Sequence, residues 1–193
     1  MDHITQIRNS IKSSIALKSL LLENDIIQQN VSVIIELLIH CFLNKGKVFF
    51  CGNGGSAADS QHLASEFSGK YYLNRKPLNA EALHVNSSYL TATANDYSFS
   101  EIYARALEAK GAKGDVLICL TTSGKSENII KALKKAKEMQ ITSVCFVGKE
   151  SKLVENLCDL LVAIPSLETP RIQEAQMLLG HIICEQVESQ LFG

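Results

Sequence analysis

The chain has 193 residues, of which 46% are hydrophobic, and its 19 Lys and Arg residues nearly balance 20 Asp and Glu residues. This composition predicts one domain with a full apolar core, and the net charge of −1 argues against a nucleic-acid binder. The six cysteines form no Cys-x-x-Cys pair and most lie in apolar runs, which is typical of free thiols in a reducing, cytoplasmic compartment.

The first 45 residues predict two helices that are separated near residues 23–25. The second, over residues 26–43, is apolar around most of its circumference, so it is buried in a core or in a subunit interface. Because only a small domain follows, we expect an oligomer. The most apolar stretch, residues 31–43, is too short to span a membrane and contains Glu36 and His40, and the N-terminus lacks a secretory pattern. We therefore expect no membrane partner.

From residue 46 onward, short apolar runs alternate with helical patterns. The predicted strands are 48–51, 82–85, 116–121, 143–147 and 160–164, and the predicted helices are 56–68, 87–94, 101–110, 126–139, 153–158 and 170–191. The lysines of 131–137 recur at helical spacing and are interpreted as a solvated helix face. This alternation predicts a single α/β domain, a three-layer α/β/α structure with a five-stranded parallel sheet and two leading helices. We place residues 1–45 in the oligomer interface and residues 46–193 in the α/β core.

Two strand-to-helix turns carry the chemistry. The first, residues 51–56, reads Cys-Gly-Asn-Gly-Gly-Ser, and the second, residues 121–126, reads Thr-Thr-Ser-Gly-Lys-Ser. Glycines let the backbone approach an anion, and hydroxyls and free N–H groups at a helix start bind phosphate. Ligands of an open parallel sheet lie beyond the carboxyl ends of its strands, where both turns fall. Either turn alone is equally consistent with a capped helix, but together they predict a phosphorylated small molecule.

The helix after the first turn carries His62 and Glu66, which are four residues apart and share one face. Such a pair can hold a metal ion or move a proton. Asp59 either contacts the ligand or supports the first turn, and both readings stay open. We interpret His40 and His84 as structural, and His181 taken alone is typical of a core histidine because Leu179 and Ile182 flank it.

The longer string Gly-Asn-Gly-Gly-Ser-Ala-Ala-Asp-Ser-Gln-His, residues 52–62, together with the Thr-Ser-Gly-x-Ser of the second turn, resembles the SIS domain family, which binds phosphosugars. Within that family the chain is similar to the phosphoheptose isomerases over essentially its whole length. Glu66, Gly69, the pair Asn95-Asp96, the run Arg-Ile-Gln-Glu at 171–174 and His181 fit the same pattern.

The resemblance implies a role for each matching residue. Glu66 would be the base that removes a proton from carbon, and His181 its acid/base partner. Zinc would be held by His62, Glu66, Gln173 and His181, and nitrogen and oxygen ligands without a thiolate suit a catalytic Zn²⁺. The implied substrate-binding residues are Asn53, Gly54, Gly55, Ser56, Glu66, Asn95, Asp96, Thr121, Thr122, Ser123, Ser126 and Gln173. The resemblance also implies a homotetramer with active sites at subunit boundaries.

The implied reaction converts sedoheptulose 7-phosphate to D-glycero-D-manno-heptose 7-phosphate through an enediol, for bacterial lipopolysaccharide, capsule or S-layer glycan synthesis. Two alternatives stay open: a non-catalytic SIS module that senses a phosphosugar or docks to a protein, and an isomerase of another phosphosugar. Two positions depart from the family pattern. Gln176 stands where a histidine is frequent, and Lys70 follows Gly69 where many members have arginine. Lysine keeps the charge but loses bidentate phosphate geometry.

Overall fold

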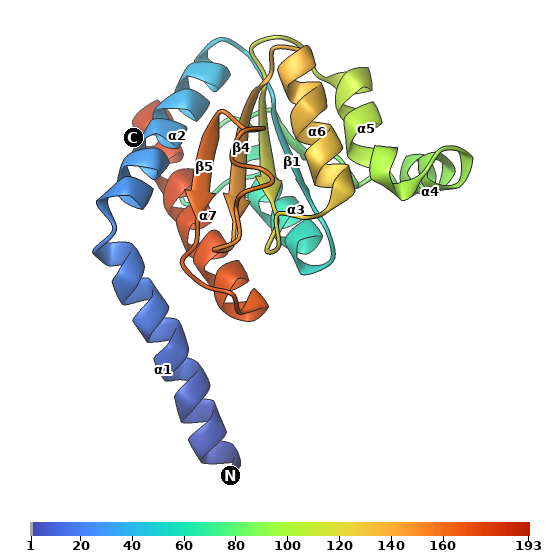
Figure 1. Ribbon diagram of the computed structural model, residues 1–193. Coiled ribbons are helices and arrows are strands. Elements are labelled where there is room, and N and C mark those ends of the chain that lie inside the picture. Colours follow the sequence, from blue (N-terminus) through green and yellow to red (C-terminus); the bar gives the residue numbers. More distant parts are fainter. Residues whose placement is uncertain (1) are drawn as a thin grey trace.

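The computed structural model describes residues 2–193 and contains a parallel sheet with helices on both faces (Figure 1). Over this range the sheet has five strands in the order β2-β1-β3-β4-β5, and every neighbouring pair is parallel. The strands are β1 (Val48–Gly52), β2 (Ala80–Ala82), β3 (Val116–Leu120), β4 (Thr142–Val147) and β5 (Leu160–Ala163). The predicted α/β class, parallel sheet and leading helices are confirmed.

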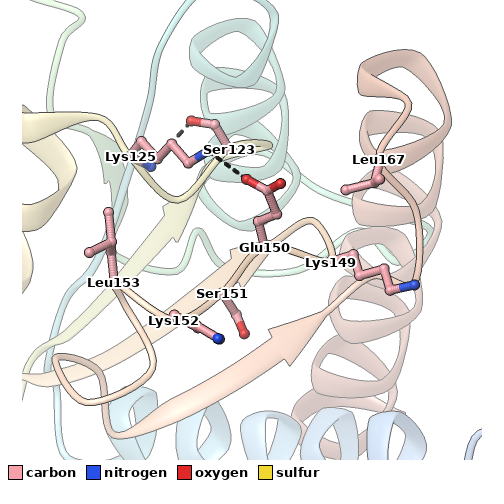
Figure 2. Close-up of a pocket in the computed structure, with 8 residues that line it drawn as sticks. All are labelled: Ser123, Lys125, Lys149, Glu150, Ser151, Lys152, Leu153 and Leu167. Atoms are coloured by element: carbon pink, nitrogen blue, oxygen red, sulfur yellow. Dashed lines mark hydrogen bonds and ion pairs between the residues drawn. The ribbon is translucent and has the colours of Figure 1, made fainter.

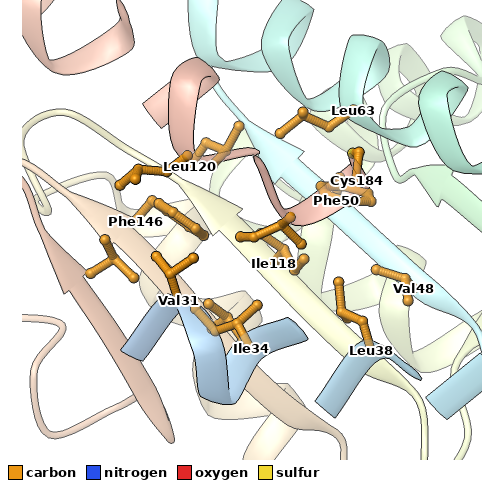
Figure 3. Close-up of a cluster of buried hydrophobic side chains, with 14 of the residues drawn as sticks. Val31, Ile34, Leu38, Val48, Phe50, Leu63, Ile118, Leu120, Phe146 and Cys184 are labelled. Carbon is orange, nitrogen blue, oxygen red and sulfur yellow. The ribbon is translucent and has the colours of Figure 1, made fainter. Parts of the chain in front are cut away.

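The sheet separates two apolar cores. Helices α2 (Asp25–Leu43), α3 (Gly55–Ser68) and α7 (Thr169–Phe192) pack on one face, and α5 (Ile102–Lys110) and α6 (Glu127–Glu138) pack on the other. Because successive strand residues point to opposite faces, Phe50 and Ile118 enter the first core and Phe49 and Leu117 the second. Figure 3 shows the first core, in which Val31, Ile34 and Leu38 of α2 lie over the strands. The central strands are therefore apolar throughout.

Helix α1 (His3–Leu22) extends away from this body (Figure 1). It begins at Asp2, whose carboxylate accepts the Thr5 N–H at 2.8 Å. Its last turns contribute the buried Leu17 and Leu21 to the first core. Along the rest, an apolar stripe at helical spacing is more than half exposed, consisting of Ile4, Ile7, Ile11 and Ile15.

Helix α2 is longer than the apolar stretch 31–43 and is long and apolar enough to cross a membrane by length and composition. One such helix is weak evidence for a membrane span, because a core helix of a soluble protein passes the same test. One face of α2 packs into the first core through Ile27, Val31, Ile34, Leu38 and Cys41.

Two predicted elements differ from the structure. Strand β2 lies two residues earlier than predicted because Ala80 pairs with Val48, which leaves Leu83 buried just beyond the strand. The helix predicted over 153–158 is wrong, since residues 152–157 form turns. Two consecutive turns there are closed by N–H donors to the Ser151 and Val154 carbonyls, and so short a segment does not propagate as a helix.

The remaining helices agree with the prediction to within a few residues. They are α1, α2, α3, α5, α6 and α7, whose bounds are given above, and α4 (Ser87–Asp96). A 3₁₀ turn (Phe99–Glu101) joins α4 to α5. The strand order creates a switch point between β1 and β3. The connection through α3 leaves β1 on one face, whereas the connection through α6 leaves β3 on the other. A crevice at the carboxyl ends of such strands is the usual ligand site, and the two predicted turns flank it.

Candidate active site

The first turn connects β1 to α3 and requires glycine at Gly52, where a Cβ would collide with the Ser56 carbonyl oxygen, as well as at Gly54 and Gly55. Gly54 has φ +57°, a conformation that residues with a side chain rarely adopt. A Cβ at Gly55 would collide with the carboxamide of Gln173, which reaches over from α7. Ser56 is buried, and its carbonyl accepts the Ser60 hydroxyl at 2.7 Å. The turn thus presents exposed backbone at Gly54 and Gly55, with the Ser56 side chain beneath it.

A reciprocal amide pair joins the first turn to the start of α6. Asn53 Nδ2 donates to Asn128 Oδ1 at 2.9 Å, and Asn128 Nδ2 donates to Asn53 Oδ1 at 2.8 Å. Asn128 is 2% exposed. Asn53 is a predicted substrate contact, whereas Asn128 was not predicted; its one signal is a polar residue on the buried face of an amphipathic helix. This pair holds the two sides of the switch point together.

The second turn leaves hydroxyls available at the start of α6. Thr121 is buried, and its Oγ1 accepts the Gly124 N–H at 3.2 Å, while the Thr122 carbonyl accepts the Gly148 N–H at 3.2 Å. The exposed Ser123 hydroxyl accepts the Lys125 N–H at 3.2 Å. Within residues 2–193, Ser126 occupies the N-cap position without a side-chain capping bond. Its hydroxyl is therefore free to bind an anion beside the helix N-terminus.

Several hollows adjoin these turns, and two of them are larger than the hollow of about 260 Å³ beside Thr122 and Ser123. One, of about 440 Å³, lies between the turns and is lined by Asn53, Ser98, Phe99, Ser100, Ser126, Glu127 and Asn128. The other, of about 600 Å³, lies on the opposite side of the second turn and is basic (Figure 2). Lys125, Lys149 and Lys152 line it, and Lys125 pairs with Glu150 at 2.5 Å. Both volumes lie in the range of small-molecule sites.

His62, Glu66 and His181 converge from α3 and α7. His62 Nε2 lies 2.9 Å from His181 Nε2 and 3.4 Å from Glu66 Oε1, and one ligand atom from each residue lies within 4.8 Å of the others. Tetrahedral Zn²⁺ with bonds of about 2.0–2.1 Å separates its ligand atoms by about 3.3 Å, so this donor set fits such an ion. The structure shows a group that could hold a metal.

The structure brings three of the four predicted ligands together, and it places the Gln173 carboxamide against Gly55. Gln173 contacts Gly55 at the start of α3, whereas His62 lies about 10 Å further along that helix at a rise of about 1.5 Å per residue. Helix α7 has the same arrangement, with Gln173 near the turn and His181 near the other ligands. Gln173 as a metal ligand therefore stays a prediction.

The surroundings of this group include residues that the sequence analysis missed. Tyr71 has its ring centroid 6.0 Å from that of His181, and burial and the adjacent Tyr72 raise the pKa of Tyr71 to about 12. Arg75 Nη2 donates to the Glu66 carbonyl at 2.8 Å. The one available signal was Glu188, an acidic residue on the apolar face of the last helix, which accepts from the Arg75 guanidinium at 2.7 Å.

Gln176 and Lys70, the two departures from the family pattern, lie in different environments. Gln176 is fully buried and its Nε2 donates to the Thr121 carbonyl at 3.0 Å, so it ties α7 to the second turn. Its Oε1 has no partner among residues 2–193. Lys70 is exposed directly after α3.

Asn95 and Asp96 lie exposed at the end of α4, on the opposite face of the sheet from α3 and α7. Asn95 Nδ2 donates to Asp96 Oδ1 at 2.9 Å, and in the described part of the chain neither side chain makes another hydrogen bond. Within one chain, these two predicted substrate contacts therefore lie apart from the group formed by His62, Glu66 and His181, called the metal-type group below.

Asp59 and His84 are partly buried near the first turn, and some of their buried hydrogen-bonding atoms are unused. Asp59 Oδ2 and both ring nitrogens of His84 lack partners among residues 2–193. Burial raises the pKa of Asp59, which His62 opposes, and burial lowers the pKa of His84. Asp59 thus has an oxygen free for a ligand or a water.

Comparison with known proteins places this arrangement in a family. The SIS domain model matches residues 14–148. A phosphoheptose isomerase of Clostridium acetobutylicum is 50% identical over 187 residues, which cover 97% of this chain and 95% of that protein. The chain belongs to the phosphoheptose isomerase family of SIS domain proteins.

Other phosphoheptose isomerases are similar to this chain over nearly its whole length. That of Burkholderia pseudomallei (strain 1710b) is 42% identical over 190 residues, covering 98% of this chain and 96% of the relative. The solved phosphoheptose isomerase of Neisseria gonorrhoeae superposes with a TM-score of 0.91 at 34% identity, covering 97% of this chain and 100% of that chain. The solved phosphoheptose isomerase of Francisella tularensis superposes with a TM-score of 0.93 at 31% identity, covering 98% of this chain and 100% of that chain. The phosphoheptose isomerase fold thus extends over both leading helices.

Proposed function

We propose that this member of the family is an isomerase that converts sedoheptulose 7-phosphate to D-glycero-D-manno-heptose 7-phosphate. The observation that carries the proposal is the convergence of His62, Glu66 and His181 between α3 and α7, two helices that also border the glycine turn. Ketose–aldose isomerisation needs a base, a group that moves protons between oxygens, and a means to hold the enediolate charge. This group supplies the residue types for all three.

In the proposed mechanism Glu66 removes the proton from the carbon beside the carbonyl. His181 moves a proton on the substrate oxygens, and the proton returns to the neighbouring carbon to complete the conversion. Glu66 has a side chain that is 21% exposed, so substrate can reach it while α3 and α7 exclude most water. The Tyr71 ring lies beside the His181 ring, with their centroids 6.0 Å apart.

We further propose zinc as the metal, held by His62, Glu66 and His181, with Gln173 as the fourth ligand. A bound Zn²⁺ would polarise the substrate carbonyl. Carboxylate coordination would lower the basicity of Glu66, and for that reason base and ligand roles are tested separately below.

The phosphate is proposed to lie at the two turns. Ser126 and the N-terminus of α6 offer a hydroxyl and backbone N–H groups, while Thr122 and Ser123 add donors from the same turn. The exposed backbone at Gly54 and Gly55 faces the sugar. The lysines of the adjacent hollow attract an anionic substrate toward this edge.

We propose a cytoplasmic homotetramer. The exposed stripe of Ile4, Ile7, Ile11 and Ile15 on the projecting α1 needs apolar cover. Asn95 and Asp96 lie away from the metal-type group within one chain, so a subunit boundary is where the two parts would meet. The cysteine usage favours a reducing compartment.

A direct assay tests the function. Purified protein is incubated with sedoheptulose 7-phosphate, with and without added Zn²⁺, and the heptose phosphate is measured beside pentose and hexose phosphate substrates. We expect turnover of the heptulose phosphate and a preference for it over the shorter sugars. Preference for another phosphosugar would reassign the substrate, and binding without turnover would favour the sensing module.

A further inference from the structure

Arg75 closes the carboxyl end of α3 although it lies outside that helix. Its Nη1 donates to the carbonyls of Phe67 and Gly69 at 2.8 and 3.2 Å, and its Nη2 donates to the Glu66 carbonyl at 2.8 Å. The last carbonyls of a helix have no partner within it, and the planar guanidinium offers enough N–H donors to satisfy several of them together. Arg75 therefore fixes the backbone of the turn that carries the Glu66 carboxylate.

Glu188 connects this arginine to α7. Its Oε1 accepts from Arg75 Nε at 2.7 Å and from the Tyr71 N–H at 2.9 Å, and the side chains of the ion pair are nearly fully buried. Glu188 follows His181 by seven residues, about two helical turns, so both side chains lie on the same face of α7. The ion pair, called the Arg75–Glu188 clamp below, thus joins the end of α3 to the face of α7 that carries His181.

The clamp also places Tyr71 beside the metal-type group. The backbone of Tyr71 is held by the Glu188 carboxylate, and its ring centroid lies 6.0 Å from that of His181. The clamp therefore reaches the metal-type group at two points, through the backbone of Glu66 and through the ring beside His181.

The geometry of the metal-type group depends on how α3 lies against α7. His62 and Glu66 come from α3 and His181 comes from α7, and the Nε2 atoms of the two histidines are 2.9 Å apart. A binding constellation has to keep its productive geometry to within about 0.5 Å. A contact that fixes one helix against the other near these residues can therefore control metal affinity without touching the metal.

We propose that Arg75 and Glu188 are positioning residues, which set the approach of α3 to α7 and thereby the affinity of the metal-type group for Zn²⁺. The choice of ion rests on the proposed function, whereas the arrangement of the three side chains that the clamp sets does not require the ion. A pair that contributed only stability would lower the free energy of unfolding and leave the metal affinity of the folded protein unchanged.

The zinc affinity of the folded protein separates these two roles. Arg75→Lys keeps the charge but loses the planar fork of donors, and Glu188→Gln keeps the shape but loses the charge. The Kd for Zn²⁺ is measured by competition with a chromophoric chelator in the absence of denaturant, and circular dichroism confirms that each variant is folded. We expect Kd to rise about tenfold or more, as it does when a partner that orients a metal ligand is removed.

Leu133→Ala is the matched control. Leu133 of α6 is fully buried in the core on the other face of the sheet, and among residues 2–193 no side chain of α3 or α7 belongs to that core. The cavity should lower the urea midpoint as the clamp variants do, but the Kd for Zn²⁺ should stay that of the parent chain. The proposal is overturned if zinc affinity is unchanged in the clamp variants, or if the control loses as much affinity as they do.

A second measurement needs no metal. The ring nitrogen resonances of His62 and His181 in the metal-free protein report the contact between these rings, and the exposed His40 of α2 is the internal reference. We expect both resonances to shift in Arg75→Lys and Glu188→Gln but not in Leu133→Ala. If the parent chain binds no zinc, these resonances decide alone, and unshifted signals overturn the proposal. Absence of turnover in the parent chain would remove the proposed function and leave both measurements valid.

Discussion

Arg75 Nε lies 2.7 Å from Glu188 Oε1, and both side chains are only 2% exposed. Glu188 also accepts the N–H groups of Tyr71, Tyr72 and Leu73 at 2.9, 2.6 and 2.8 Å. Arg75 in turn donates to the Glu66 carbonyl. One buried ion pair thus fixes the segment after α3 and connects the end of α7 to the helix that carries the proposed base.

Removing the charge of Glu188 should destabilise the protein. Glu188→Gln leaves the Arg75 guanidinium buried without its counter-ion, and we expect a loss of about 3 kcal/mol in the free energy of unfolding. Urea denaturation measures this change. Glu150→Gln is the matched control, because its pair with Lys125 is exposed, and it should leave the unfolding midpoint unchanged. Equal effects of the two substitutions would contradict a buried role for the Arg75–Glu188 pair.

The same carboxylate predicts a pH dependence of stability. Burial acts to raise the pKa of Glu188, but the three backbone N–H groups and Arg75 outweigh it and lower the pKa to about 2. A lowered folded-state pKa stabilises the protein above the unfolded value of about 4.3, and this contribution disappears as the pH falls toward 2. The difference in unfolding free energy between the parent chain and Glu188→Gln should therefore be largest at neutral pH and shrink below about pH 4. A difference that stays constant from pH 7 to pH 3 would refute the assignment.

The proposed base is tested by Glu66→Gln. The substitution keeps the shape of the side chain but removes the proton acceptor, so kcat should fall by at least about 100-fold. The fold should persist, because the Glu66 carboxylate lies at the edge of the helix pair rather than in a core. Turnover is measured with sedoheptulose 7-phosphate, and Glu185→Gln, at an exposed position of α7, serves as control. Near-normal turnover of the Glu66 variant would remove it as the base.

Metal binding is predicted to depend on the two histidines together. Zinc content by elemental analysis should approach one ion per chain, and His62→Ala or His181→Ala should each abolish it, because each removes one of the converging nitrogens. His40→Ala, an exposed histidine on α2, should retain the metal. Chelation should lower activity and added Zn²⁺ should restore it. Full activity of chain that contains no metal would exclude a catalytic ion.

The sequence predicted the features that local patterns determine, namely the central strands and the shared helix face of His62 and Glu66. Apolar runs located the central strands, because strands buried on both faces are apolar throughout, and the spacing of His62 and Glu66 placed them on one helix face. Strand β2 was displaced because its register depends on Val48, far away in the chain. Asn128 and Arg75 were missed, and the role of Gln176 was not predicted, because each acts through a partner distant in sequence. No local pattern marks a polar residue whose hydrogen-bond partner lies elsewhere in the fold.

The amide pair of Asn53 and Asn128 gives a prediction about substrate binding. Asn128→Leu leaves the Asn53 amide without its partner and loosens the first turn from the start of α6. We expect KM to rise about tenfold, the equivalent of about 1.4 kcal/mol or one buried hydrogen bond, with kcat little changed. Because both residues act as one unit, the double variant Asn53→Leu/Asn128→Leu should be no worse than either single variant. Steady-state kinetics of the four proteins measures this coupling. Additive effects would mean that Asn53 binds substrate directly, as the sequence first suggested, and that the pair does not hold the two turns together.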